Sequence, residues 1–496
     1  MMSAELAAPP QAPAADTAFF GHPRGLAVIA FTEGWIGFSL YGTQACLILY
    51  MTSDLLRPGH SAHIIGFSTL LALLRPVYGN LQGEPLASAI MGLYIALIWA
   101  TPIAGGILSD RCIGRTRTIL LGCLLMTVGH FLLAFEASFL LALLFLIGGV
   151  GCGACVQAQL GSLYATSDPR RTDAFQIYSM AVCLAVILAP LICGTLGEAY
   201  AWHWGFAAAG CGMLIGLIVY LAGRHTLPPE APVRRLPQSG RSSELKPGDR
   251  QVLLLLLLLL PIVALVLLGN TQLFNAYLIW ARENYQLVFF GHRMPTSWLL
   301  SIDAAISVVT ILVSVVFWRW WERHHAAPHE LAKMAMGAGI MATAPLILAL
   351  AAWQDGGRHA IGLEWGLAFH LVNSFGFANI YPIGLALFSR VAPSALGATI
   401  VNAYGLNLFL SNLLAGSLGG LLPDLSGAHF WLLHAALIAV GALMLFTVFR
   451  SFSALLVRPG QAAEWRASEP ACTKPATSPA SPDSPGSDHS SSLGPA

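Results

Sequence analysis

The chain has 496 residues, of which 56% are hydrophobic and 10% are charged, and its formal net charge is +1. This composition excludes a water-soluble globule, which carries about 25% charged residues. The near-zero net charge excludes nucleic-acid binding through a basic surface. Most of the nine cysteines lie inside apolar runs, which excludes a disulfide-stapled secreted domain. A polytopic helical membrane protein remains.

Twelve apolar runs are long enough to cross a bilayer as helices, each of which needs about 20 residues. In chain order the first six predicted spans are 26–52, 88–108, 118–135, 138–165, 172–196 and 202–223. The other six are 251–280, 296–318, 331–353, 360–388, 396–422 and 428–449. These runs are continuous rather than alternating, which excludes a β-barrel. The sequence therefore predicts an all-α membrane protein built from two six-helix halves.

Composition changes mark the remaining segments. We expect disordered tails at 1–24 and 451–496, six-helix halves at 25–223 and 251–450, and a basic, Pro-rich linker at 224–250. The semi-apolar stretch 53–87 is too interrupted for a span, so it is predicted to be an outer cap or an interfacial helix. With twelve spans, 20 of the 25 Lys and Arg residues fall on the side of the two termini. The positive-inside rule then predicts a multi-pass protein of the inner membrane with both termini cytoplasmic.

The loop after the second span reads GGILSDRCIGRTRT, residues 105–118. Gly106 would let two helices approach closely, and Asp110 could pair with nearby arginines in one conformation and release them in another. The predicted gating loop comprises Gly106, Asp110, Arg111, Gly114, Arg115 and Arg117. An ordinary positive-inside loop is the alternative. The spacing resembles the loop 2–3 signature of the major facilitator superfamily, whose fold has six plus six helices.

Further stretches resemble the proton-dependent oligopeptide transporter (POT) family. They are FTEGWIGFSLYGTQACLILYM at 31–51, the run 93–130, LYATSDPRRTDAFQIYSM at 163–180, the run 188–210 and YPIGLALFSRVAP at 381–393. The resemblance covers nearly the whole membrane region. It implies uptake of small peptides driven by the proton gradient, with alternating access to a central site.

The chain departs from this family at several charged positions. Members carry Glu-x-x-Glu-Arg in the first span, where this chain has Glu33, Ile36 and Gly37. Gly153 stands in place of a lysine, and Phe377 in place of a glutamate. The resemblance implies that the arginine and lysine hold a peptide's carboxylate and the glutamate its amino group. A plain di- or tripeptide would meet no counter-ions here, and burying its unpaired termini is costly.

Ionisable groups at membrane depth are candidates for function because placing them there costs free energy. Proton coupling or substrate contact is expected of Glu33, Tyr41, Gln44, Asp303, His370 and Asn373. Glu33 shares a helix face with Tyr41. It is interpreted as a proton carrier or a site for a substrate amine, and the alternative is a buried, hydrogen-bonded carboxylate. Three interpretations of Asp303 are open: it replaces the missing glutamate, it caps a helix, or it lies at the membrane–water interface. His370 is a proton relay or a hydrogen-bonded core group.

Neutral amides and aromatic side chains are also frequent in the spans. The amides are expected to hydrogen-bond an uncharged polar substrate in a cavity or, alternatively, to join helices. The aromatic side chains, Tyr178 among them, are expected to add aromatic surface to that cavity. The predicted cavity residues are Trp35, Gln157, Asn270, Gln272, Asn275, Phe377, Tyr381, Tyr404 and Asn407. A cavity rich in amides and aromatics but poor in charge suits a capped peptide-like compound or an aromatic natural product.

The sequence thus predicts a secondary active transporter, not an enzyme, driven by the proton gradient. It has no Walker A motif, and no cofactor or metal is expected. Its partners are expected to be a small-molecule substrate, protons and membrane lipids, with no nucleic acid and no second subunit. Export of an antibiotic or toxic metabolite is the first alternative, and a non-transporting sensor is the second.

Overall fold

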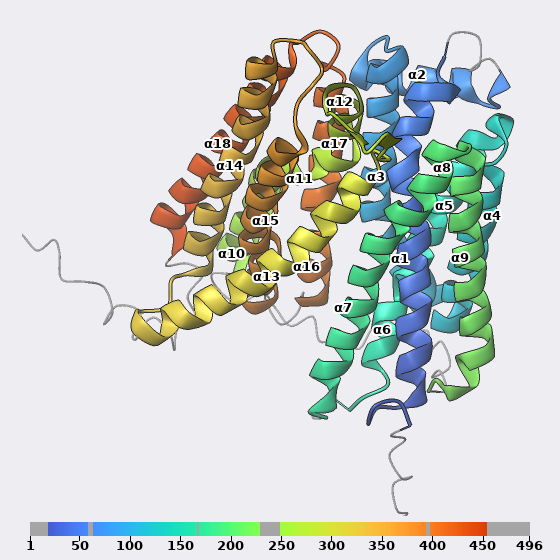
Figure 1. The fold of residues 1–496 in the computed structure, drawn as a ribbon. Coiled ribbons are helices and arrows are strands. Elements are labelled where there is room, and N and C mark those ends of the chain that lie inside the picture. The colour runs from blue at the N-terminus through green and yellow to red at the C-terminus, as the bar shows by residue number, and fades with distance from the viewer. Residues whose placement is uncertain (1–17, 58–62, 166–167, 229–248, 393–396, 454–496) are drawn as a thin grey trace, which may run out of the picture. The chain divides into compact units, whose positions relative to one another are not determined.

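Two groups of helices make up the protein in a computed structural model that describes residues 18–57, 63–165, 168–228, 249–392 and 397–453 (Figure 1). The first half contains α1 (Arg24–Tyr50), α2 (Phe67–Tyr78), α3 (Gly83–Leu108), α4 (Arg115–Leu132), α5 (Phe139–Gly153), α6 (Cys155–Gly161), α7 (Arg170–Ala189), α8 (Thr195–Ala199) and α9 (Trp202–Gly223). The second contains α10 (Asp249–Val266), α11 (Leu268–Thr271), α12 (Ala276–Asn284), α13 (Trp298–His324), α14 (Glu330–Asp355), α15 (Leu363–Val391), α16 (Gly397–Tyr404), α17 (Leu406–Gly419) and α18 (Gly427–Phe452).

Short elements connect or extend these helices. They include the π-helical turns η1 (Met51–Leu55), η3 (Ser109–Ile113) and η5 (Pro190–Gly194), and the 3₁₀ turns η4 (Glu136–Ser138), η6 (Arg224–Thr226) and η7 (Gln272–Phe274). The strands β1 (Val288–Phe289) and β2 (His292–Arg293) form a small antiparallel hairpin between α12 and α13. The predicted tails and linker lie largely outside the described residues, so their expected disorder stays a prediction.

The twelve predicted spans are confirmed as helices. In the described part of the chain, nine helical segments are long and apolar enough to cross a membrane. The other three predicted spans correspond to α1, α4 and the pair α16–α17. Several spans are broken rather than straight, since the seventh runs through α10, α11, η7 and α12. Breaks at membrane depth are tolerated where neighbouring helices satisfy the freed backbone groups.

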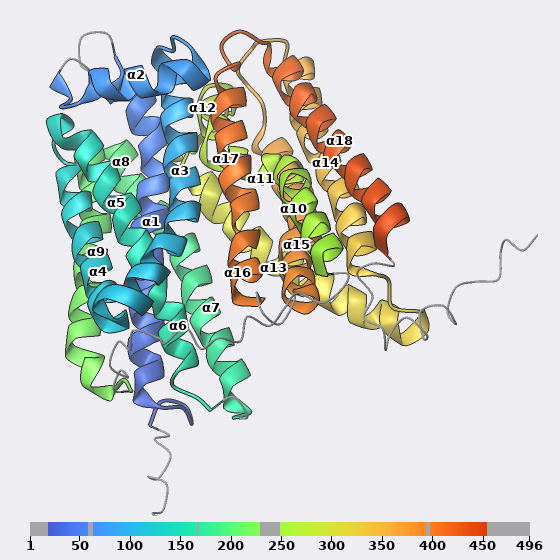
Figure 2. The ribbon, with the colours of Figure 1, turned by 180° about the vertical axis from the view of Figure 1, so that it is seen from behind.

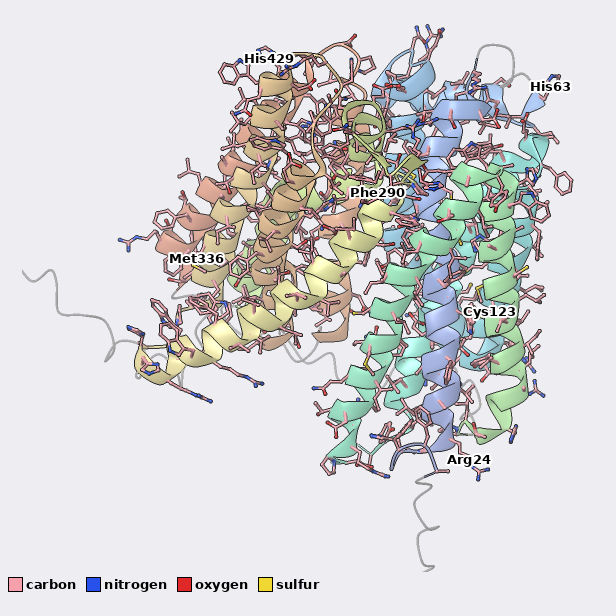
Figure 3. The ribbon with its side chains drawn as sticks, in the orientation of Figure 1. Arg24, His63, Cys123, Phe290, Met336 and His429 are labelled. Atoms are coloured by element: carbon pink, nitrogen blue, oxygen red, sulfur yellow. The ribbon has the colours of Figure 1, made fainter. Side chains whose placement is uncertain are left out.

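The stretch 53–87 contains the predicted helix. α2 covers twelve residues, and its Phe67, Leu70, Leu71 and Tyr78 side chains pack against the core of the first half. These positions recur every three to four residues, which is the pattern of a helix with one apolar face on the protein. α2 lies at the end of the first half opposite Arg24, on the same side as His63 (Figures 2 and 3).

The two halves meet chiefly where α17 packs on α3 and α13 packs on α7. The Ser88 hydroxyl donates to the Gly416 carbonyl at 3.2 Å, and the Asn275 amide donates to the Ser88 carbonyl at 3.1 Å. Between them, a Cβ built on Gly92 would lie 2.6 Å from the Gly416 Cα, so the two backbones touch. These contacts lie at the end of the protein that holds α2, α8 and α12. We call this end of the protein the closed end.

The glycine that brings the second span against its neighbour is not the predicted one. A Cβ built on Gly106 would meet nothing within 4 Å. A Cβ built on Gly105 would lie 1.8 Å from the Gly151 carbonyl oxygen, so α3 and α5 are in backbone contact there. The prediction for Gly106 was therefore wrong by one residue, because a run of two glycines does not reveal which one faces the neighbouring helix.

Candidate functional site

The acid of the first half lies where α1 packs on α7. The Glu33 side chain is half-buried, and its carboxylate lies within hydrogen-bonding range of the buried Tyr178 hydroxyl. Two turns along α1, the ring of Tyr41 lies 6.3 Å from that of Phe274 in the second half. The Tyr41 and Tyr381 phenols also lie within electrostatic range of each other. This face of α1 therefore carries the Glu33 carboxylate and, two turns further on, the aromatic contact of Tyr41 with the second half.

A chain of three buried polar groups lies in the second half, between α12, α13 and α15. The His370 Nδ1 lies 2.9 Å from the Asp303 Oδ1, and the Tyr277 hydroxyl lies 2.8 Å from the His370 Nε2. The Ser374 hydroxyl also donates to the Asp303 Oδ1, at 3.1 Å. His370 is fully buried, whereas 13% of the Asp303 side chain is exposed. We call Asp303, His370 and Tyr277 the relay.

The relay has the connectivity needed to pass a proton. A carboxylate only accepts hydrogen bonds, so the His370 Nδ1–H donates to Asp303 and the Nε2 accepts from the Tyr277 hydroxyl. This places the two ring nitrogens of one imidazole between an acid and a phenol, the arrangement in which histidine moves protons. The second half thus holds an acid and a base in direct contact, whereas Glu33 contacts only a phenol.

Aromatic side chains surround the inner end of the relay. The Tyr277 ring stacks on Phe369 at 5.1 Å between centroids and meets Trp431 edge-on at 6.2 Å. Both of these side chains are almost completely buried. Such a dry environment strengthens the hydrogen bonds of the relay and makes an unpaired charge there costly. In the described part of the chain, no three His, Cys, Asp or Glu side chains are grouped so as to hold a metal ion.

The relay histidine belongs to one continuous face of α15. His370, Ser374, Phe377 and Tyr381 follow each other at spacings of four, three and four residues, which places them on the same side of the helix. Phe377 and Tyr381 stack almost in parallel at 5.5 Å, and both are half-buried. Because Tyr381 lies near Tyr41, this aromatic pair lies between the relay and the Glu33 face of α1.

Several predicted cavity residues lie elsewhere. Trp35 packs on α9, where a Cβ on Gly216 would lie 2.8 Å from the Trp35 Cβ, so it faces its own half. Gln272 donates to the Ala415 carbonyl and bonds His434 inside the second half. Tyr404 is fully buried against Phe388. Helix-to-helix packing, which was the alternative for Gln272, uses the same chemistry as a polar cavity wall.

The other predicted amides are distributed between packing and exposed positions. Asn275 joins the halves at the closed end, and Asn407 donates to the Tyr404 carbonyl while its Oδ1 has no partner among the described residues. Neither polar atom of the buried Asn373 amide has a partner in the described chain. Gln44 is buried, Asn270 is half-buried, and Gln157 is exposed on α6.

Two of the positions that lack the family's charges face uncharged neighbours. A Cβ built on Gly153 would be in ordinary contact with the Ile36 Cδ1, at 3.9 Å, so these two positions face each other. A Cβ built on Gly37 would lie 3.2 Å from the Ala185 Cβ, so a methyl group on α7 limits the space beside Gly37.

The predicted gating loop forms η3 and the start of α4. Gly114 has a φ of +84°, which glycine adopts without strain, and it turns the chain between the two helices. Asp110 and Arg111 are exposed, and Arg115 is half-buried. Asp110 is not among the ion pairs found in the described residues, so the predicted pairing of Asp110 with Arg111, Arg115 or Arg117 is not formed in this conformation.

Two members of the site were not among the predicted proton-coupling or substrate residues. Tyr277 follows a long apolar run, and a tyrosine there is indistinguishable in the sequence from a packing residue. Tyr178 was noted only as an aromatic of the cavity region. The four-residue spacing of His370 and Ser374 was the available signal that this face of α15 is polar.

Comparison with known proteins agrees with this architecture. The family model for the Major Facilitator Superfamily matches residues 58–419. A di-/tripeptide transporter of Lactococcus lactis subsp. lactis (strain IL1403) is 29% identical over 468 residues, which cover 88% of this chain and 84% of that protein. The uncharacterized transporter YclF of Bacillus subtilis (strain 168) is 27% identical over 450 residues, covering 79% and 86%.

Solved structures show the same fold. A crystal structure of a POT peptide transporter in complex with sulfate superposes with a TM-score of 0.76 at 23% identity, covering 89% of this chain and 97% of that one. A POT family transporter in complex with 5-aminolevulinic acid gives a TM-score of 0.74 at 22% identity, covering 90% and 99%. The chain therefore belongs to the Major Facilitator Superfamily, a superfamily of transporters rather than enzymes, and is related within it to the POT peptide transporters.

Proposed function

We propose that this protein is a proton-coupled secondary transporter in which the relay of Asp303, His370 and Tyr277 carries the coupled proton. The buried contact between Asp303 and His370, at 2.9 Å, is the observation that carries the proposal. An acid and an imidazole in contact at membrane depth cost free energy that a purely structural helix contact would not need. Glu33, with its Tyr178 partner, is the second proton site or the contact for a substrate amine.

The proposed substrate is a peptide-like organic solute without the paired terminal charges of a free peptide. The related proteins include di-/tripeptide transporters, which supports a peptide-like backbone. Gly153 faces Ile36, and Gly37 faces Ala185. These uncharged contacts support a substrate that lacks terminal charges. The stacked Phe377 and Tyr381 offer an aromatic surface for a side chain or a ring of such a compound.

The experiment is a flux measurement on purified protein in liposomes that enclose a pH-sensitive dye. A pH gradient is imposed, and plain dipeptides, N-acetylated and C-amidated peptides, and aromatic antibiotics are added in turn. We expect capped peptides to drive proton entry in the wild type and not in Asp303→Asn. Glu364→Gln, which neutralises an exposed acid at the start of α15, is the matched control and should behave as the wild type.

Each other result contradicts a stated part of the proposal. Equal flux with plain dipeptides would show that the missing charges do not set the substrate. Proton entry that persists in Asp303→Asn would remove the relay from coupling. Failure of every compound to move protons in the wild type would overturn proton-coupled transport, and compound release without proton entry would favour a different driving force.

We further propose that the protein lies in the inner membrane with the closed end outside and both termini in the cytoplasm. Cys112 in η3 is exposed and provides a natural label at the opposite end. In a background that carries Cys183→Ser, Cys211→Ser and Cys472→Ser, a membrane-impermeant maleimide should not label intact cells but should label opened ones. The additional change Cys112→Ser should abolish that labelling. Labelling of intact cells at Cys112 would reverse the orientation.

A further inference from the structure

Helix α13 begins at the junction of the two halves and is not capped by its own residue. Ser297 occupies the N-cap position, but its side chain makes no capping hydrogen bond. The Glu198 carboxylate of α8 instead accepts the Thr296 N–H at its Oε2 and the Ser297 N–H at its Oε1, both at 2.8 Å. A carboxylate at this position also interacts favourably with the positive end of the helix dipole. The first half thus supplies the cap of a helix in the second.

Other contacts dock the first turns of α13 on the same surface. The Trp298 indole N–H donates to the Thr195 hydroxyl at 2.8 Å, and the Ser301 hydroxyl donates to the Ile187 carbonyl at 2.7 Å. A Cβ built on Gly194 would lie 1.9 Å from the Ser297 Oγ, so the lack of a side chain there admits the helix start. These contacts must break when the halves separate at the closed end.

The same two turns of α13 carry the acid of the relay. Asp303 follows Trp298 by five residues, which corresponds to about 8 Å along a helix. Glu198 holds the start of α13 to the first half, and His370 holds Asp303 to α15 in the second half. A movement of the α13 start therefore acts directly on the geometry of the relay.

Glu198 is accessible from the closed end. It lines two neighbouring pockets of about 400 and 320 Å³. The charged and imidazole groups that face it there are Asp54, Arg57, Glu136, His203, Arg282 and Arg293. Its other titratable neighbours are the Cys46 thiol and the phenols of Tyr50 and Tyr200.

We propose that Glu198 is a positioning residue that holds the closed end shut and links its opening to the relay. This inference rests on the proposed function. The Glu198 carboxylate accepts two charge-assisted bonds, from the Thr296 and Ser297 N–H groups, and such bonds are stronger than bonds between neutral groups. Loss of these two bonds frees the start of α13 from the first half.

The test measures the separation of the halves at the closed end by spin-label distances. The labels are placed at Phe135→Cys and Phe290→Cys, two exposed positions in different halves; Phe290 is labelled in Figure 3. The exposed natural cysteines Cys112, Cys183 and Cys211, together with Cys472, are replaced by serine. In the protein with the natural Glu198, the short distances of the closed end should predominate.

The Glu198→Gln variant should show a larger share of long distances. Its amide has one acceptor oxygen and an NH₂ group that faces the second N–H, so we expect the open share to rise about tenfold. Glu136→Gln is the matched control, because it removes the same charge from the same pocket without touching α13. Trp298→Phe, which removes only the bond to Thr195, should shift the distances in the same direction by less.

The outcomes separate this inference from the proposed function. Wild-type distances in Glu198→Gln would overturn the role of Glu198, even if Asp303→Asn abolishes proton flux. A shift in Glu198→Gln alongside normal flux in Asp303→Asn would overturn the relay and leave the closing contact standing. An equal shift in Glu136→Gln would assign the effect to the charge of the pocket and contradict the inference.

Discussion

Replacement of His370 by glutamine is expected to reduce proton-driven transport about a hundredfold, the size of effect of losing a proton-transfer group. An amide fills a similar volume and can hydrogen-bond Asp303, but it cannot pass a proton from one atom to another. The measurement is proton entry into liposomes, made together with counterflow, in which substrate exchanges without net proton movement. We expect His370→Gln to lose proton entry and to retain counterflow.

His434 is the matched control for this substitution. It is also a fully buried histidine of the second half, and it bonds Gln272 and the Phe430 carbonyl, with no acid in contact. His434→Gln should keep most of the wild-type proton entry. If both variants lose counterflow to the same extent, His370 is a packing residue and the relay has no part in coupling.

Replacement of Gly105 by alanine is expected to destabilise the protein by about 3 kcal/mol, the upper part of the range for overpacking. The new methyl group would lie 1.8 Å from the Gly151 carbonyl oxygen, and backbone cannot rotate away as a side chain can. The contact lies between α3 and α5, so these two helices of the first half would have to move apart to accommodate the methyl group. Thermal unfolding in detergent, followed by the loss of monodisperse protein on size exclusion, measures the effect.

The neighbouring glycine provides the comparison for this experiment. A Cβ on Gly106 meets nothing within 4 Å, so Gly106→Ala should change stability by less than about 0.5 kcal/mol, as substitutions away from contacts do. Equal stability of both variants would show that α3 and α5 can separate at no cost. Destabilisation by Gly106→Ala alone would restore the glycine assignment predicted from the sequence.

Hydropathy predicted the fold almost completely, because crossing a bilayer demands long apolar runs and little else in a chain satisfies that demand. The breaks within spans were not predictable in the same way. The seventh span breaks at Leu267 and again over residues 272–275, on either side of α11. The hydropathy of a span does not indicate where its helix breaks.

The site was predicted in part, and the missing part has a physical cause. Asp303 and His370 were found singly because an ionisable group at membrane depth is conspicuous in any sequence. Their contact was not found, because it depends on how α13 and α15 rotate against each other. The amides of Gln272 and Asn275, which were predicted to line a cavity, donate to backbone carbonyls of neighbouring helices.

The glycine contact between α3 and α17 has a thermodynamic consequence. Where Gly92 meets Gly416, the halves touch through backbone, and glycine has no side-chain rotamers to immobilise when the contact forms. At these two positions, parting the helices releases no side-chain entropy. The contact therefore holds the closed end by close packing without the rotamer cost that larger side chains would carry.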